Sequence, residues 1–461
     1  MKLKTTFLTL NNGTQICAPE DINLMTNFVL QEQGDWFEDE IHFVRKFIQP
    51  GMKALDIGAN YGLYSTAIAT GLGSDGKLWC FEPTQNTADA LRQTISINNL
   101  DETIELIQAG LSDHIGQATF YTSENAELNS LTSTTSTTGE KQTIDLLTLD
   151  HCFEKYQWDQ LDFIKLDAEG EEVKILKAAE KTLSTCSPLV LFELKHGSEV
   201  NMPLISAFEN LGYDSYYLIP GLNALYPLDL TKAVDQYQLN LFCCKKETAD
   251  KLSKSGLLIK KTESHDEKSL INESDFFNNL PFSTNIQLTP NAPNNDTDRN
   301  YQFAFKTYAH SRDESLNVAE RLNYLQSSFE YVKKILASGE SKIERLSTLA
   351  RISYDIGQRK IGNQIIRYII QQYIEQQKQF GISEVFVPPC SSFETIDPKG
   401  HTSNWILSSV VEQFIIKLEY SCYFMDINNV LPLFGILKRL DFLQPTMAQR
   451  LSTIEKRAKT H

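Results

Sequence analysis

Two carboxylates and two glycines around residue 56 have the types and the spacing of a nucleoside-binding site. Residues 55–62 read LDIGANYG, so Asp56 ends an apolar strand, and Gly58 and Gly62 bracket a turn into a helix. Glycines there let the backbone approach a ligand and adopt positive φ. Glu82 ends the next expected strand, where a carboxylate can hold both hydroxyls of a ribose. Because the GxGxxG spacing that binds a diphosphate is missing, the pattern predicts a pocket for an adenosine that lacks one.

A second set of polar groups follows two later strands. The strand DFIKLD ends in Asp167, with Glu169 two residues on, and the strand LVLFEL leads to Glu193 and His196. In a doubly wound sheet these strand ends are neighbours, so the four groups are expected to meet at the carboxyl edge beside the glycine loop.

These polar groups could supply a general base. His196 is the first candidate, because an imidazole near its unperturbed pKa takes up a proton at neutral pH, although it could also be a surface residue of the loop KHGSE. Asp167 is the second candidate, and its alternative role is to cap the helix that follows. Glu169 is a third, whereas Glu171 and Glu172 are expected only to complement a helix N-terminus.

A metal-assisted variant is open at the same positions. A hard divalent cation could be bound by Asp167, Glu169, Glu193 and His196 and could polarise a hydroxyl group. The sequence has no closely spaced DD or HxH pair there, so a site without metal is favoured.

The elements that must position these groups alternate between strands and helices up to about residue 245. Such alternation predicts an α/β fold with a doubly wound, mostly parallel, Rossmann-like sheet. The late strand 238–243 could be an antiparallel edge. Strands at 118–122 and 142–149 form an excursion around a Ser/Thr-rich loop at 132–139. The strands expected in the main sheet are 53–58, 77–82, 103–107, 162–167 and 189–194.

The chain changes character after residue 246. Residues 289–300 are rich in Asn, Asp and Pro and are typical of a linker. From residue 301 onwards apolar residues recur at helical spacing. A separate all-α domain is expected there, with a helix at 316–336, an antiparallel pair at 343–356 and 360–376 hinged near Gly357, and a helix at 405–424.

The composition excludes some partners. With 43 Lys and Arg against 59 Asp and Glu, the 461-residue chain has a formal net charge of −16, which disfavours binding to nucleic acid. No apolar run reaches the length of a membrane-spanning helix. The eight cysteines form no CxxC pair and are expected to be reduced thiols in a cytoplasmic protein.

The motifs together resemble the FkbM family of S-adenosylmethionine-dependent methyltransferases. The resemblance covers roughly residues 1–245 and rests on QGDWFEDEI at 33–41, DIGANYG at 56–62, FEP at 81–83, AGLSD at 109–113, TLD at 148–150 and DFIKLDAEGEE at 162–172. With the composition change after residue 246, four parts are expected: a cap segment at 1–50, a cofactor-binding methyltransferase domain at 51–248, a linker at 249–300 and the helical domain at 301–461, which lies outside the resemblance.

The resemblance also implies residue roles. The residues expected to bind the methionine end of S-adenosylmethionine are Asp56, Gly58, Asn60 and Gly62. The ribose is expected at Glu82, beside Pro83, and the adenine at Leu111 and Ser112. Asp167 is expected near the methyl-transfer centre. Residues 36–40 form a cap in the family, but Glu38 and Asp39 are interpreted here as the solvated first turn of a helix.

The function implied is O-methylation of a hydroxyl on a saccharide or glycan. Two alternatives are O-methylation of a small natural product, and an inactive cofactor-binding scaffold. In the scaffold reading the helical domain recruits a protein partner.

Overall fold

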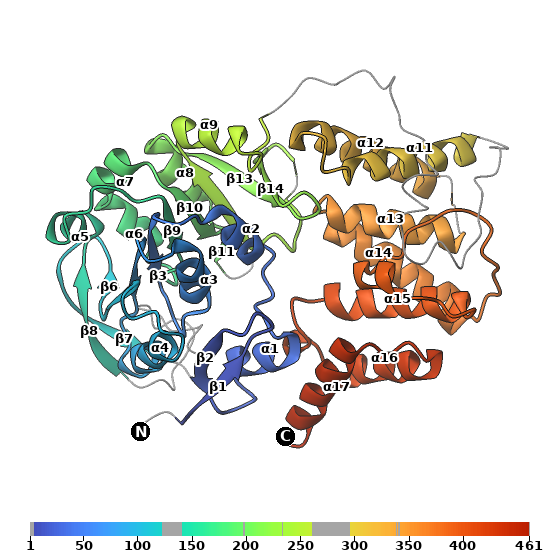
Figure 1. The fold of residues 1–461 in the computed structure, drawn as a ribbon, viewed down its shortest axis with the longest axis horizontal. Helices are drawn as coiled ribbons and strands as arrows, with labels where there is room; N and C mark the ends of the chain where they lie inside the picture. The colour runs from blue at the N-terminus through green and yellow to red at the C-terminus, as the bar shows by residue number, and fades with distance from the viewer. Residues whose placement is uncertain are drawn as a thin grey trace.

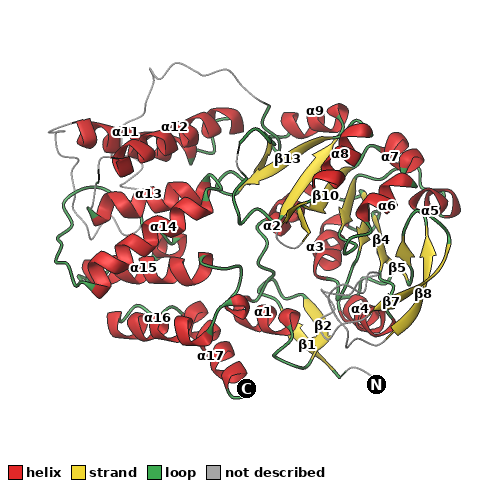
Figure 2. Ribbon diagram, turned by 180° about the vertical axis from the view of Figure 1, so that it is seen from behind, coloured by secondary structure: helices red, strands yellow, loops and turns green. Residues whose placement is uncertain are grey.

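An eight-stranded sheet forms the centre of the N-terminal half, and a stack of helices forms the C-terminal half (Figures 1 and 2). The computed structural model describes residues 4–121, 141–196, 199–232, 234–260, 296–337, 339 and 342–460. The predicted Ser/Thr-rich loop at 132–139 and most of the predicted linker, at 261–295, lie outside the described residues.

The sheet has the strand order β14-β13-β15-β10-β9-β3-β4-β5. Its five strands from β10 to β5 run parallel, which confirms the predicted doubly wound arrangement. The strands are β3 (Lys53–Ile57), β4 (Lys77–Phe81), β5 (Ile104–Ile107), β9 (Phe163–Leu166), β10 (Leu189–Glu193), β13 (Asp214–Ile219), β14 (Ala224–Pro227) and β15 (Asn240–Cys244).

The late strand was predicted as an antiparallel edge, and that position is wrong. β15 is antiparallel to β10 but lies inside the sheet, because β13 pairs with its other side and β14 follows as the edge. All five residues of β15 are buried, as an interior strand requires.

Helices cover both faces of the sheet, and each face has its own apolar core. One face packs against α2 (Glu40–Phe47), α3 (Leu63–Leu72), α4 (Gln85–Ile97) and α9 (Lys246–Lys254). The other face packs against α5 (Leu149–Lys155), α6 (Glu172–Lys177), α7 (Glu180–Cys186) and α8 (Met202–Asn210). Alternate strand residues enter opposite cores, so Ala54 and Leu55 of β3 face different helix layers.

The predicted excursion forms a small separate sheet. β7 (Gly116–Tyr121) pairs antiparallel with β8 (Lys141–Leu147), and β6 (Gly110–Leu111) pairs parallel with β8. A further hairpin, β1 (Thr5–Thr9) with β2 (Gln15–Pro19), lies near the N-terminus, followed by α1 (Met25–Gln33). The last short pair, β11 (Lys195–His196) with β12 (Glu199–Val200), follows β10.

The C-terminal half is a stack of helices, as predicted (Figure 1). Successive helices pack against one another, and the predicted pair hinged near Gly357 is α13 with α14. The first helix begins at Asp296, inside the segment predicted as a linker. The helices are α11 (Asp296–Ser311), α12 (Val318–Ala337), α13 (Ile343–Asp355), α14 (Arg359–Ile369), α15 (Thr402–Lys417), α16 (Ile427–Leu440) and α17 (Pro445–Ala458).

The two halves meet in two places. The tip of the β13–β14 hairpin enters the helical core through Ile219 and Leu222. At the second place, α1 packs against α17, so the two chain termini lie on the same side of the molecule (Figure 1). There the buried carboxylate of Glu32 forms an ion pair with Arg450 at 2.8 Å and accepts a hydrogen bond from the backbone NH of Cys422 at 3.0 Å.

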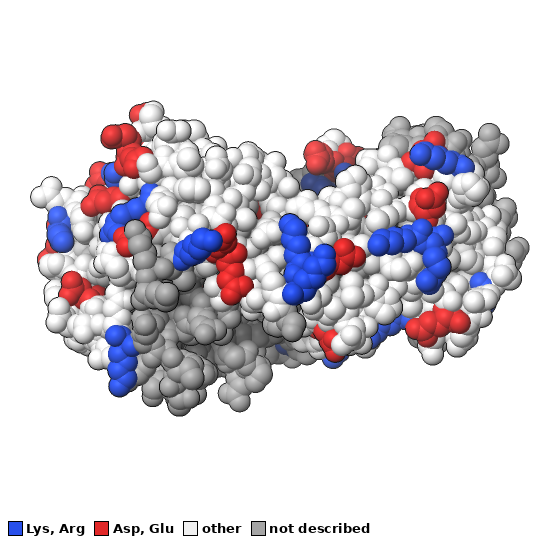
Figure 3. Space-filling model, turned by 90° about the horizontal axis from the view of Figure 1, so that it is seen from below, with Lys and Arg blue, Asp and Glu red and all other residues white. Residues whose placement is uncertain are grey.

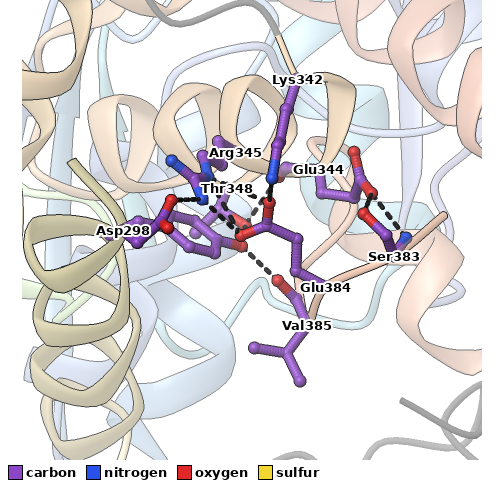
Figure 4. Close-up of polar contacts among 9 residues, drawn as sticks. Asp298, Lys342, Glu344, Arg345, Thr348, Ser383, Glu384 and Val385 are labelled. Atoms are coloured by element: carbon purple, nitrogen blue, oxygen red, sulfur yellow. Dashed lines mark hydrogen bonds and ion pairs between the residues drawn. The ribbon is translucent and has the colours of Figure 1, made fainter. Parts of the chain in front are cut away.

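An extended segment in the helical domain is fixed by a polar cluster (Figure 4). Glu384 forms ion pairs with Lys342 and, at 2.9 Å, with Arg345 of α13, and Arg345 also pairs with Asp298 of α11. The backbone NH of Val387 donates to Oγ1 of Thr348 at 3.1 Å. The segment before Cys390 is therefore held firmly against α13.

The described surface carries both signs of charge. On the face drawn in Figure 3, Lys and Arg side chains lie among Asp and Glu side chains on both halves of the molecule. None of the helices that the structure describes is long and apolar enough to cross a membrane.

Candidate active site

The glycine loop after β3 lies against the end of β9. Gly58 has φ of +77°, and a Cβ built on it would lie 1.8 Å from the carbonyl oxygen of Asp167. The backbone NH groups of Gly58 and Ala59 both donate to the carbonyl of Phe81 at 3.0 Å. Only glycine fits where two backbone segments approach this closely. The loop thus joins the ends of β3, β4 and β9 at one edge.

Glu82 lies at the same edge, directly after β4. Its Oε2 accepts a hydrogen bond from the backbone NH of Asn60 at 3.2 Å, and its Oε1 accepts from the NH and the hydroxyl of Thr84. The residue is only 6% exposed, and burial raises the pKa of its carboxyl despite these hydrogen bonds. Glu82 is therefore fixed beside the glycine loop, where the sequence predicts a ribose.

Lys165 is a functional candidate that the sequence analysis missed. It lies in the middle of β9, in register with Asp56 on β3, and both side chains point to the face that α3 covers. Its Nζ lies 2.9 Å from Oδ2 of Asp167, 3.3 Å from the carbonyl oxygen of Gly58 and 3.9 Å from Oδ1 of Asp56. Burial alone would lower the pKa of this ammonium, but Asp167 and Asp56 raise it, so the lysine is a fixed cation.

The signal for Lys165 was present in the sequence. A lysine inside the otherwise apolar run DFIKLD is costly to bury unless acids surround it. Asp56 meets that need: it is fully buried and accepts a hydrogen bond from the hydroxyl of Ser65 at 2.6 Å. Burial raises the pKa of Asp56, and the charge of Lys165 opposes that rise. The buried carboxylate of Asp56 thus offsets the cost of burying the charge of Lys165.

Four polar groups were predicted to meet at the strand ends. The structure describes the side chains of the three carboxyl groups among them, Asp167, Glu169 and Glu193. Asp167 has 40% of its side chain exposed and is the open one. Burial is the largest cause that raises the pKa of Glu169 and of Glu193, and the negative charge of Asp167 is the next. Glu172 adds to the rise in both. Glu169 adopts φ of +50°, directly before Gly170. His196 lies in β11, and its side chain is outside the described residues, so its role as a base stays a prediction.

The cap segment contributes more than the sequence suggested. Glu38 was interpreted as a solvated residue, and this is wrong: it is half-buried, and the hydroxyl of Tyr64 donates to its Oε2 at 2.5 Å. The Tyr64 ring in turn lies 5.4 Å from Nζ of Lys165. Burial raises the pKa of Glu38, while Tyr64 and Lys165 lower it. The cap therefore reaches the group around Lys165 through Tyr64.

The remaining predicted residues occupy the rim of the same edge. Leu111 is buried in β6, and the hydroxyl of the buried Ser112 donates to Glu171 at 3.0 Å. Pro83 is half-buried beside Gly110. Glu172 accepts hydrogen bonds from the backbone NH groups of residues 168 and 170, which is the local role expected of it at the start of a helix.

A comparison with protein families decides what this site is. Residues 56–215 match the model of the methyltransferase FkbM domain. The chain contains an FkbM methyltransferase domain. The FkbM domain begins at Asp56 of the glycine loop and ends in β13, so it includes every strand end described above. Its cofactor is S-adenosylmethionine.

Solved structures similar to the chain include other methyltransferases. An rRNA methylase candidate from Clostridium thermocellum is 10% identical, with 46% of this chain and 95% of that chain covered and a TM-score of 0.29. Methyltransferase FkbM from Methylobacillus flagellatus is 17% identical, with 42% and 43% covered and a TM-score of 0.30. An O-methyltransferase from Bacillus cereus, in complex with SAH, is 16% identical, with 45% and 80% covered and a TM-score of 0.28. None of the curated proteins matches the chain.

The residues of the FkbM domain fit S-adenosylmethionine. Oδ1 of Asn60 is a buried acceptor with no hydrogen-bond partner among the described residues, which suits the amino group of the methionine moiety. The carboxylate of Glu82 keeps acceptor capacity for ribose hydroxyls. Gly58 and Gly62 adopt positive φ, and a Cβ on either would meet protein atoms, so the glycines allow the tight loop that brings Asn60 beside Glu82. Leu111 offers an apolar surface near the rim.

No group of three or more His, Cys, Asp and Glu side chains within the described part of the chain has the arrangement of a metal site. The cluster at the strand ends instead has its own cation, Lys165, within 3 Å of Asp167.

Proposed function

We propose that the protein transfers a methyl group from S-adenosylmethionine to a hydroxyl group of a saccharide. The observation that carries this proposal is the half-exposed carboxylate of Asp167, held by Lys165 beside the glycine loop. An alkyl hydroxyl is a weak nucleophile while it keeps its proton, so a fixed carboxylate at the transfer edge favours an oxygen acceptor.

S-adenosylmethionine would supply an electrophilic methyl group when bound, on a sulfonium that would leave as a neutral thioether. The acceptor oxygen forms the new C–O bond, and the carboxylate of Asp167 takes the hydroxyl proton. Lys165 orients that carboxylate through the 2.9 Å ion pair, and Asp56 holds Lys165 in turn. Glu169 and Glu193 have raised pKa values, so they favour the protonated form and donate hydrogen bonds to the acceptor. Alignment of oxygen, methyl and sulfur lowers the remaining barrier.

The first experiment is calorimetric titration of the full chain with S-adenosylhomocysteine, with and without EDTA. Micromolar binding that EDTA does not change is expected, because the proposed site uses Lys165 rather than a metal. Transfer of labelled methyl groups to a set of saccharides then tests the acceptor class. A folded protein that does not bind S-adenosylhomocysteine would contradict the proposal.

Two further expectations belong to the proposal. We propose a cytoplasmic location, which suits eight free cysteines of which seven are buried. We also propose that the outer surface of the helical domain is available to a protein partner.

A further inference from the structure

A cavity of about 460 Å³ lies between the N-terminal half of the chain, outside the segment that matches the FkbM model, and the helical domain. Its walls come from the cap segment, from the chain before β15, and from α13, α14, α15 and α17. The volume falls in the range of small-molecule sites, roughly 300–1,000 Å³. No part of the predicted cofactor pocket other than the cap segment contributes to its walls, so the cavity is a separate space beside that pocket.

The cavity reaches the methyl-transfer edge at two places. Glu38 lines it and is hydrogen-bonded to Tyr64, which lies next to Lys165. Leu239 also lines it, and its carbonyl accepts a hydrogen bond at 2.7 Å from the backbone NH of Leu194, the residue after Glu193. Glu38 and Leu239 therefore separate the cavity from the carboxyl groups that the proposed function uses by a single layer of residues.

One wall presents an arginine between two aromatic rings. The guanidinium of Arg359 lies 4.4 Å from the ring of Tyr237 and 4.8 Å from the ring of Tyr420. Its Nε donates to the carbonyl of Lys417 at 2.8 Å, whereas Nη2 is buried and has no hydrogen-bond partner in the part of the chain that is described. A buried donor without a partner is costly, so this atom points to a ligand acceptor.

A second lining residue, Glu412 of α15, presents an unpaired acceptor. Glu412 is 1% exposed, and its Oε1 accepts a hydrogen bond from the hydroxyl of Ser392 at 3.1 Å. Its Oε2 has no hydrogen-bond partner among the described residues. Burial raises the pKa of Glu412 to about 7, so near neutral pH the group can either accept or donate.

The wall at Glu412 is rigid. Cys390 lies beside Glu412, and its backbone NH donates to the hydroxyl of Ser409 at 3.0 Å. The polar cluster of Figure 4 fixes the preceding residues through Glu384 and Val385. The positions of the unpaired polar atoms are thus set before any ligand binds.

We infer that this cavity binds the methyl acceptor, and that the acceptor is a short, uncharged saccharide; the inference rests on the proposed function. Sugar hydroxyls can satisfy both Nη2 of Arg359 and Oε2 of Glu412, and a sugar ring can pack on Tyr237 or Tyr420. An apolar ligand would leave both polar atoms unpaired. The other charged residues of the lining include three ion pairs, Glu32 with Arg450, Asp39 with Lys417 and Asp355 with Arg351, so they do not require a ligand of either charge.

The test uses the full chain on an array of neutral and acidic mono- to trisaccharides. Fluorescently labelled protein retained on the array measures binding. Labelled methyl groups from S-adenosylmethionine that become attached to the saccharides measure transfer. The variants are Arg359→Met and the isosteric Glu412→Gln, and Arg367→Met is the matched control. Arg367 lies on the same helix and also stacks on a ring, that of Phe414 at 5.2 Å, but it does not line the cavity. Thermal unfolding and titration with S-adenosylhomocysteine confirm that each variant is folded.

The expected result is binding of at least one neutral saccharide that weakens about tenfold or more in both cavity variants and not in Arg367→Met. Binding or transfer that is unchanged in both cavity variants would overturn the inference and leave the proposed function intact. Saccharide binding that depends on both cavity residues but is never followed by methyl transfer would overturn the proposed function and, with it, the assignment of the ligand as the methyl acceptor. Binding of acidic saccharides alone, or of none by a protein that binds S-adenosylhomocysteine, would overturn the saccharide class.

Discussion

The ammonium nitrogen of Lys165 lies 2.9 Å from Oδ2 of Asp167, two residues further along the chain. Asp167 is half-exposed at the carboxyl edge of the sheet, while Lys165 is buried within it. The pair connects the open edge to Asp56, which is fully buried on the neighbouring strand. A carboxylate paired in this way with a buried ammonium has a fixed direction, which the proposed role of Asp167 as proton acceptor requires.

Lys165→Met should destabilise the fold and reduce turnover. The variant leaves the carboxylate of Asp56 buried without a cation, and loss of one partner of a buried pair costs about 3–5 kcal/mol. Urea unfolding measures the free-energy change. Lys53→Met on β3 is the matched control, because Lys53 pairs with Asp159, which is 75% exposed, and such pairs contribute less than about 1 kcal/mol. Equal effects of the two substitutions would contradict the role of Lys165.

Gly58→Ala should weaken binding of S-adenosylhomocysteine and destabilise the fold. A Cβ at this position would lie 1.8 Å from the carbonyl oxygen of Asp167, so β9 or the loop must move. Gly51→Ala is the control, because Gly51 has a similar φ of +84° but open space around its Cβ position. The control bears only the conformational cost of about 1–2 kcal/mol, and overpacking at residue 58 should add about 1–3 kcal/mol. Similar stabilities of the two variants would show that the close approach is unimportant.

Most of the fold could be predicted from the sequence, because periodicity and turn residues specify it locally. The run LDIGANYG specified a strand, a turn and a helix, and the structure has β3 and α3 there. The position of β15 could not be predicted, since it depends on pairing with β13 on one side and β10 on the other. Strand order is a long-range property that a local pattern does not contain.

The site was predictable only where its residues follow strands. Asp167 and Glu193 follow strands whose ends meet, so topology brings them together. Glu38 could not be predicted, because its partner Tyr64 comes from α3 and its burial depends on how the cap segment packs. The cavity beyond Glu38 needs residues from both halves of the chain, such as Arg359, and local spacing says nothing about that contact.

Glu82→Ala should weaken binding of S-adenosylhomocysteine while the protein stays folded. The carboxylate is fixed by the NH groups of Asn60 and Thr84 at the position expected for the ribose. Loss of hydrogen bonds to a charged group should reduce affinity by about tenfold or more in calorimetry. Glu154→Ala makes the same change in charge at an exposed residue far along the chain and should leave affinity unchanged. Unchanged affinity in a folded Glu82→Ala protein would remove this residue from the cofactor site.

Glu40→Gln should change how stability depends on pH. Burial, with the nearby charges of Glu38 and Asp39, raises the pKa of Glu40 to about 8, far above its usual range. Between about pH 4.5 and 8 the folded protein therefore keeps a proton that the unfolded chain releases, and stability falls as the pH rises through this window.

The glutamine carries no such proton, so Glu40→Gln should remove part of the fall. At pH 8.5 the variant should be more stable than the wild type by about 1–3 kcal/mol, and at pH 4.5 the two should be alike. Urea unfolding at both pH values measures the difference. A variant that is less stable at pH 8.5 would show that Glu40 is ionised in the folded protein.

The pair of Glu32 and Arg450 should couple the two ends of the chain. Glu32 lies on α1 and is fully buried, and Arg450 on α17 lies 2.8 Å from its Oε1. Glu32→Gln should therefore cost about 3–5 kcal/mol, because it leaves the guanidinium buried without its anion.

A double-mutant cycle separates this coupling from packing. The double variant Glu32→Gln with Arg450→Met should lose much less free energy of unfolding than the two single variants lose in sum. The reason is that no unpaired charge then remains buried. The exposed pair of Lys4 and Glu20 provides the control cycle, with an expected coupling below about 1 kcal/mol. Additive effects at Glu32 and Arg450 would mean that the apolar contact between α1 and α17 alone joins the two halves.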